Sequence, residues 1–153
     1  MTKFIYSDEF YLETEFEIEN ASLDFDREEM VLDFEIQAVA KQAKYREHHV
    51  DGDYEKAEIA PRFFSDGNEI TKDQINGDGQ DMFDGYNLIY SFEDDEDEDP
   101  RILVYQGSFA SFDNVNMKLS YQPNGKYILS VNAENGELEN TVLAETEVEL
   151  TIR

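Results

Sequence analysis

Seven consecutive carboxylic acids form the most distinctive chemical feature of the sequence. They are Glu93, Asp94, Asp95, Glu96, Asp97, Glu98 and Asp99. Runs of like charge are typically solvated, and many of them are interaction segments. Carboxylates at this density attract a basic protein over a long range and then form close pairs with lysine and arginine. We therefore interpret residues 93–100 as an acidic loop that docks on a basic partner. The alternative is a solvated hairpin loop whose acids only confer solubility.

A second acidic feature is periodic. Glu13, Glu15, Glu17 and Glu19 occupy alternate positions between apolar residues. Side chains alternate across a strand, so these acids would share one face. Such a face is an ordinary solvent face in many antiparallel sheets. However, like charges that lie opposite each other across strands are destabilising, and other polar residues would confer solubility with less repulsion. We therefore predict that Glu13, Glu15 and Glu17 also contact the partner, as part of a surface that mimics a polyanion.

A third candidate lies in a segment rich in glycine and aspartate. Residues 76–84 are similar to the calcium-binding nonapeptide of β-roll repeats, with Asn76 in the first glycine position. Those repeats bind calcium only as stacked copies, and this chain has one copy. The remaining interpretation is a single calcium ion held by Asp78, Asp81 and Asp84 in a different geometry. No other cofactor is predicted.

No residue pattern points to catalysis. His48 and His49 are adjacent, so on a strand they would point to opposite faces and could not share a task. The chain has no cysteine, which excludes thiol chemistry and zinc sites of the cysteine type. No nucleophile motif is present, and no two acids stand out as a glycosidase pair. The sequence predicts a protein that is not an enzyme.

The overall charge limits the class of partner. The chain has 37 acids and 12 bases, which gives a formal net charge of -25. This charge disfavours direct binding to nucleic acid and to anionic membrane surfaces. The acids are unevenly distributed: residues 51–99 hold 17 acids and 3 bases, whereas residues 101–153 hold 7 and 4. A protein adapted to high salt usually spreads its acids evenly, so the distribution favours a basic protein partner over a halophilic housekeeping domain.

The candidate residues would be positioned by strands. Apolar and polar residues alternate over much of the chain, and the first two strands are expected to form a hairpin around a turn at Asp26 to Glu29. A change of parity predicts a bulge or bend near Asn20 and Ala21. Asn124 and Gly125 mark a second hairpin. The predicted strands are Phe10 to Glu19, Met30 to Ala38, Tyr54 to Phe64, Tyr86 to Phe92, Ile102 to Tyr105, Val115 to Tyr121, Tyr127 to Ala133 and a last strand around Val148 to Ile152.

These elements predict one all-β domain over residues 1–153 with little helix. An antiparallel β-sandwich is the expected architecture, and a closed β-barrel is the alternative. Residues 65–85 are expected to be rich in loops because they contain Gly67, Gly77, Gly79 and Gly85. The N-terminus has no signal-peptide core and no run approaches a membrane span, so we expect a cytoplasmic protein.

The leading functional hypothesis is a non-enzymatic acidic binding protein that neutralises a basic protein. Its partner would be a toxin or a nucleic-acid-binding protein, as for an immunity or antitoxin-type inhibitor or a DNA mimic. One alternative is a calcium-stabilised β-sandwich of the ligand-binding or adhesion type. The other is the halophilic housekeeping domain.

Overall fold

The computed structural model describes residues 2–7, 14–39, 60–91, 102–105, 109–112, 114–135 and 140–153. This part of the chain is all-β and has no α-helix; its one helical element is the short 3-10 helix η3 (Lys72–Gln74). The strands are β1 (Lys3–Ser7), β2 (Thr14–Asp26), β3 (Val31–Val39), β4 (Arg62–Ser65), β5 (Asn87–Ser91), β6 (Ile102–Tyr105), β7 (Phe109–Ser111), β8 (Asn114–Tyr121), β9 (Tyr127–Asn135), β10 (Asn140–Val148) and β11 (Leu150–Ile152).

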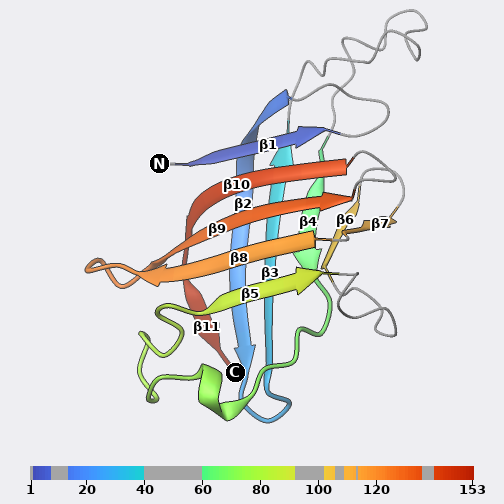
Figure 1. Cartoon of the computed structure of the whole chain (residues 1–153). Helices are drawn as coiled ribbons and strands as arrows, with labels where there is room; N and C mark the ends of the chain where they lie inside the picture. Colours follow the sequence, from blue (N-terminus) through green and yellow to red (C-terminus); the bar gives the residue numbers. More distant parts are fainter. Residues whose placement is uncertain are drawn as a thin grey trace, which may run out of the picture.

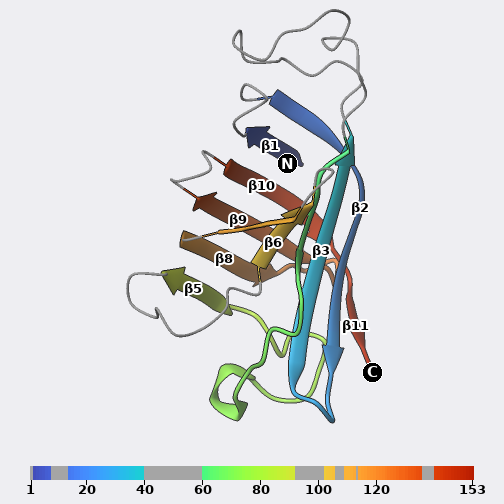
Figure 2. The same ribbon diagram turned by 90° about the vertical axis from the view of Figure 1, so that its right-hand side faces the viewer.

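The strands form one continuous sheet that curls into a half-barrel. Its order is β5-β8-β9-β10-β1-β2-β3-β4-β6-β7, and β11 pairs with β2. The pairs are antiparallel except for β2 and β11, which are parallel. The front strands β5, β8, β9, β10 and β1 run across the back strands β2, β3 and β4 (Figure 1). Figure 2 shows the front and back strands facing each other as the two walls of the core.

The predicted two-sheet sandwich is wrong, because β2 belongs to both walls. Near its start Phe16 pairs with Phe4 of the front strand β1, whereas its later residues pair with the back strand β3. The register of β2 and β3 shifts between Ile18 and Asn20. This irregularity confirms the predicted bulge, and bulges bend strands, so it allows β2 to pass from one wall to the other.

The predicted alternative, a closed barrel, is not formed either. Strands β5 and β7 are the two ends of the hydrogen-bonded path, and no pairing in the described part of the chain joins them. The acidic run Glu93 to Asp99 follows β5 in sequence and precedes β6. Because β5 pairs with β8 while β6 pairs with β4 and β7, these two strands do not form the hairpin that was considered for the run.

The C-terminal segment makes a second connection between the walls. One continuous last strand was expected, but β10 ends at Val148 and β11 begins at Leu150. Strand β10 pairs with the front strands β1 and β9, whereas β11 pairs with the back strand β2. Val148 and Leu150 are both buried, as predicted for inward residues. The chain therefore changes wall at Glu149.

Both predicted hairpins are confirmed. Strands β2 and β3 pair around a turn at 27–30, and β8 and β9 pair around Asn124 and Gly125. Gly125 has a φ of 85°, a left-handed conformation that glycine adopts without strain. On β3 the predicted inward residues Leu32, Phe34 and Ile36 are buried.

Several strands differ from the prediction. Strands β1 and β7 were not expected, because their few residues do not show a clear alternation. Strand β4 begins at Arg62, after Pro61, and so overlaps only the end of the predicted strand Tyr54 to Phe64. The earlier part of that predicted strand, from Tyr54, lies outside the described residues, as do His48 and His49.

The core is aromatic. Phe16 meets Phe4 and Tyr6 edge to face with ring centroids 5.9 Å apart, and Phe63 lies 5.5 Å from Phe112. Burial of one such side chain contributes about 1.5–3 kcal/mol. Among the described residues, every buried side-chain nitrogen or oxygen has a hydrogen-bond partner. The described core therefore leaves no buried polar side-chain atom without a hydrogen bond.

One end of the half-barrel is closed by the segment 66–86, which we call the cap. It contains η3 and lies at the bottom of Figure 1. Met82 and Phe83 of the cap are buried in the core. The hydroxyl of Tyr127 on β9 donates to the carbonyl of Gln80 and accepts the backbone N–H of Phe83 at 3.0 Å. The cap is therefore anchored by a core tyrosine.

Candidate functional site

The acidic residues of β2 lie in the open. Glu15, Glu17 and Glu19 are exposed on the part of β2 that approaches the bulge. None of the three has an ion-pair partner among the described residues. Two other predicted contacts, Glu13 and the run Glu93 to Asp99, lie outside the described residues.

The register of the β2–β3 hairpin brings two aspartates together. Asp24 lies directly opposite Asp33. Asp33 has a structural role, because its Oδ1 accepts hydrogen bonds from the Ser65 hydroxyl at 2.9 Å and the Asn68 backbone N–H at 3.0 Å. No hydrogen bond or ion pair of the Asp24 side chain is found within the described ranges. Asp24 therefore adds repulsion, and no hydrogen bond or ion pair of its side chain within the described ranges offsets that repulsion.

Three other described acids, Glu35, Glu147 and Glu149, form ion pairs with cations. Glu35 forms an ion pair with Arg62, whose guanidinium also lies over the ring of Phe64, 4.2 Å from its centroid. Lys126 contacts Glu147 at 3.3 Å and Glu149 at 3.8 Å. The exposed acids of β2 have no such ion pair within the described residues. We call Glu15, Glu17, Glu19 and Asp24 the acidic column.

The acids near Lys126 show how a neighbouring cation changes the pKa of a carboxylate. A hydrogen bond from Asn124 at 3.1 Å, together with Lys126, lowers the pKa of Glu147 below its usual value. The Lys126 ammonium lies in the turn between β8 and β9, where it reaches two carboxylates at once. No described cation does the same for the acidic column.

The predicted calcium ligands are not gathered into a site. The Oδ1 of Asp84 accepts the backbone N–H of Tyr121 at 2.9 Å, so this carboxylate ties the cap to β8. Asp78 instead lines a hollow beside Met82. In the described residues, no group of three or more acidic or histidine side chains is arranged to hold a metal ion.

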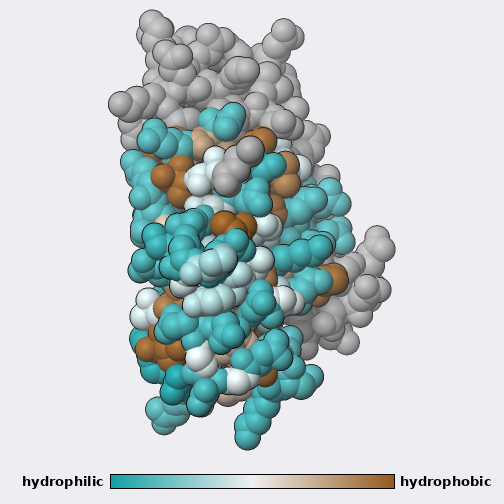
Figure 3. Space-filling model, turned by 90° about the vertical axis from the view of Figure 1, so that its left-hand side faces the viewer, coloured by the Kyte–Doolittle hydropathy of each residue, from teal (hydrophilic) through white to brown (hydrophobic). Residues whose placement is uncertain are grey.

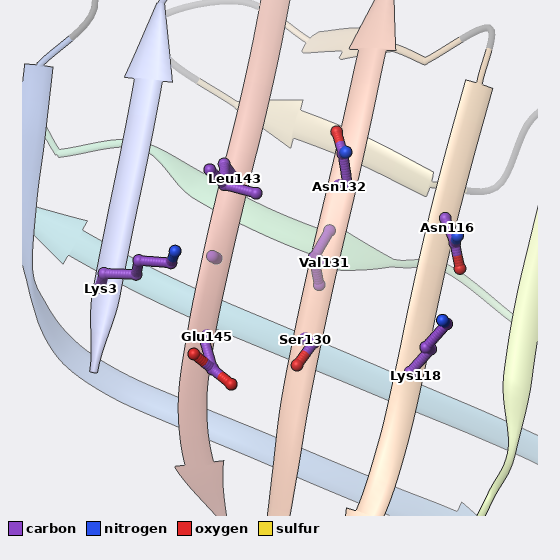
Figure 4. A pocket seen from close by; sticks show the side chains of 9 residues that line it. Lys3, Asn116, Lys118, Ser130, Val131, Asn132, Leu143 and Glu145 are labelled. Atoms are coloured by element: carbon purple, nitrogen blue, oxygen red, sulfur yellow. The ribbon is translucent and has the colours of Figure 1, made fainter. Parts of the chain in front are cut away.

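A shallow hollow of about 250 Å³ lies on the outer face of the front strands (Figure 4). Lys3 on β1 and Lys118 on β8 stand on its two sides, and Asn116 on β8 lies directly opposite Asn132 on β9. Glu145 on β10 pairs in register with Lys3. This face could not be predicted from the sequence, because the residues of each strand look like an ordinary solvent side until the register places them together.

A second hollow, of about 350 Å³, lies between the β2–β3 turn and the cap. Its walls are mainly apolar and include Phe25, Met30 and Met82, while Arg27 and Lys72 add two cations. Met30 has a φ of 56°, so this turn places a residue other than glycine in the left-handed region.

On the side of the molecule shown in Figure 3, hydrophilic residues predominate among the coloured residues, and apolar residues form small separate areas. No helix in the described part of the chain is both long and apolar enough to cross a membrane. The sequence matches no protein-family model, and no match is found among curated proteins or solved structures.

Proposed function

We propose that this protein is a non-enzymatic acidic binding protein that docks on a basic protein. The acidic column on β2 would form part of the contact surface, and the acidic run Glu93 to Asp99 would add long-range attraction. The inhibitory form of the proposal is an immunity or antitoxin-type protein, or a polyanion mimic. Such a protein would cover the cationic surface of a toxin or a nucleic-acid-binding protein.

The observation that carries the proposal is the uncompensated acidic column. Glu35, Glu147 and Glu149 show that this chain can match acids with cations. The column is left unmatched, and Asp24 even lies opposite another aspartate. Directly opposed like charges reduce stability, so a cationic partner that neutralises them would explain their presence.

The geometry also fits the mimicry version. Carboxylates on alternate residues of a strand recur about every 7 Å. Glu15, Glu17 and Glu19 therefore form a repeating line of negative charge, as a nucleic-acid backbone does. A protein that normally grips phosphates with lysine and arginine would meet a similar pattern here.

The test compares two variants with the same change in net charge. The first removes the acidic column by Glu15→Gln, Glu17→Gln, Glu19→Gln and Asp24→Asn. The control changes four exposed acids outside the column, by Asp66→Asn, Glu69→Gln, Asp78→Asn and Glu134→Gln. Each is presented to a panel of basic nucleases and DNA-binding domains, and to lysate of the source cells, at low and high salt.

We expect the wild-type protein to retain a basic protein that moderate salt releases, because salt screens exposed charges. The column variant should lose most of this capture, the control should keep most of it, and duplex DNA should compete. Equal losses in both variants would show that only net charge matters. Capture that does not depend on salt, or none at all, would contradict the proposal.

A further inference from the structure

In the part of the chain that the structure describes, strand β5 leaves one edge of the sheet unpaired. It is the terminal strand of the hydrogen-bonded path, and its one partner among the described strands is β8. Along its other edge, the backbone groups of Asn87–Ser91 have no hydrogen-bond partner among the described residues. An edge of this kind presents alternating N–H and C=O groups to any extended chain that approaches it.

The sequence of β5 does little to block such pairing. Its residues are Asn, Leu, Ile, Tyr and Ser, with no charge, proline or glycine. Natural edge strands are commonly protected by lysine, by proline or by a bulge. Ile89 at the centre of β5 is 69% exposed, more than Leu143 at 41%, the other exposed large apolar side chain described. The middle of the edge is therefore open and partly apolar.

In the sequence, acids lie on both sides of β5. Asp81 and Asp84 precede it and are exposed, and Glu93 comes two residues after Ser91. Two copies that paired along β5 would bring together two molecules with a formal net charge of -25 each. Like charges repel, so this charge opposes self-association. It suits an incoming strand with basic flanks.

We infer that the β5 edge binds an extended segment of a basic protein by β-strand addition. The partner's backbone would pair with Asn87–Ser91, one of its apolar side chains would cover Ile89, and lysine or arginine at its ends would be attracted by the negative charge of the protein. This inference rests on the proposed function, because it identifies how the basic partner is held. Backbone pairing gives a contact that does not depend on charge alone.

The probe is a synthetic peptide of alternating valine and threonine with a pair of lysines at each end. One control peptide carries glutamate at both ends. A second has N-methylated backbone amides on the edge that would pair, so it keeps the charge but cannot complete the ladder. Binding is measured by titration, and hydrogen exchange is followed at Asn87–Ser91.

We expect the lysine peptide to bind and to slow amide exchange along β5. N-methylation should weaken binding about tenfold or more, because the main-chain hydrogen bonds supply much of the affinity in strand addition. The glutamate peptide should not bind. The substitution Ile89→Lys should weaken binding, whereas Leu143→Lys adds the same charge to an interior strand and should have little effect.

The outcomes separate the two proposals. If the N-methylated peptide binds as well as its parent, or both lysine variants weaken binding equally, strand addition at β5 is wrong while charge-driven docking stands. If a basic protein is captured through the acidic column with no protection of β5, the inference also fails. If the glutamate peptide binds as well as the lysine peptide, the preference for a basic partner is lost, and with it the proposed function.

Discussion

At the scale of single residues, Asp24 and Asp33 illustrate two reasons for an acid. The Asp33 carboxylate holds Ser65 and Asn68 in place, whereas Asp24 lies opposite it with no described partner. Retention of Asp33 is explained by folding. For Asp24 no partner is found within the described residues, and we propose that it serves an interaction outside the folded chain.

The substitution Asp24→Asn should therefore stabilise the protein. We expect a gain of about 0.2–1 kcal/mol in the free energy of unfolding, because a cross-strand repulsion is removed. Urea unfolding measures it. Asp33→Ala is the opposite control and should destabilise, since two donors lose their acceptor. An Asp24→Asn variant that is less stable than wild type would reveal a structural role for Asp24.

Tyr127 is the second residue with a testable role. Its hydroxyl accepts the buried backbone N–H of Phe83 and donates to the cap at Gln80. Tyr127→Phe should reduce the free energy of unfolding by about 1–3 kcal/mol, because a buried donor is left without an acceptor. Tyr121→Phe is a matched control at a half-buried ring, and it should have a much smaller effect.

The same hydroxyl gives a pH dependence. Burial raises the pKa of Tyr127 to about 12, against 10.0 for an ordinary tyrosine. The folded state therefore favours the protonated phenol, and this stabilisation is complete below pH 10 and lost as the pH rises towards 12. Unfolding curves across this window should show a steeper loss of stability for wild type than for Tyr127→Phe. Parallel curves would contradict the role of burial.

At the scale of elements, local pattern was sufficient for most of the longer strands but not for their arrangement. The alternation in β3 and the Asn124–Gly125 turn are properties of neighbouring residues, so both hairpins could be predicted. The bulge near Asn20 was also visible as a change of parity. Its consequence was not, because the sequence does not show that β2 passes between two walls and joins them.

For the candidate site as well, features of a single strand could be predicted from the sequence, whereas features that depend on strand pairing could not. Glu15 and Glu17 could be assigned to an exposed face from alternation alone. The opposition of Asp24 and Asp33 required the register, and the free edge of β5 required the strand order. Strands distant in sequence decide both features, which is why local reasoning does not reach them.

The cap is the element on which the calcium hypothesis can be tested. It is tied down by protein groups: Asp84 holds the Tyr121 N–H, and the Asn76 N–H donates to the Met82 carbonyl at 2.8 Å. We expect the melting temperature to be unchanged by calcium or by a chelator, because a ligand stabilises only when it binds the folded state. Asp84→Ala should lower the melting temperature in both conditions. A clear rise with calcium would restore the predicted site.

At the scale of the whole molecule, the charge of -25 must be reconciled with stability. The core is aromatic, and the buried polar side-chain atoms of the described residues are all hydrogen-bonded, so we expect the fold to be stable without a high-salt environment. A partner-binding protein and a halophilic protein differ at this point. The first should fold at ordinary ionic strength, whereas the second would require molar salt.

We therefore expect a folded, cooperative protein at about 0.15 M salt, where exposed charges are screened beyond about 8 Å. Raising the salt further should increase the melting temperature modestly, because repulsion along the acidic column and elsewhere is reduced, and it should release the basic partner over the same range. Circular dichroism during heating and partner capture measure the two effects on one sample. If the surface is negative because it binds a partner, added salt should increase stability and at the same time weaken binding. A chain that unfolds without molar salt would instead place the origin of its acidity in its environment.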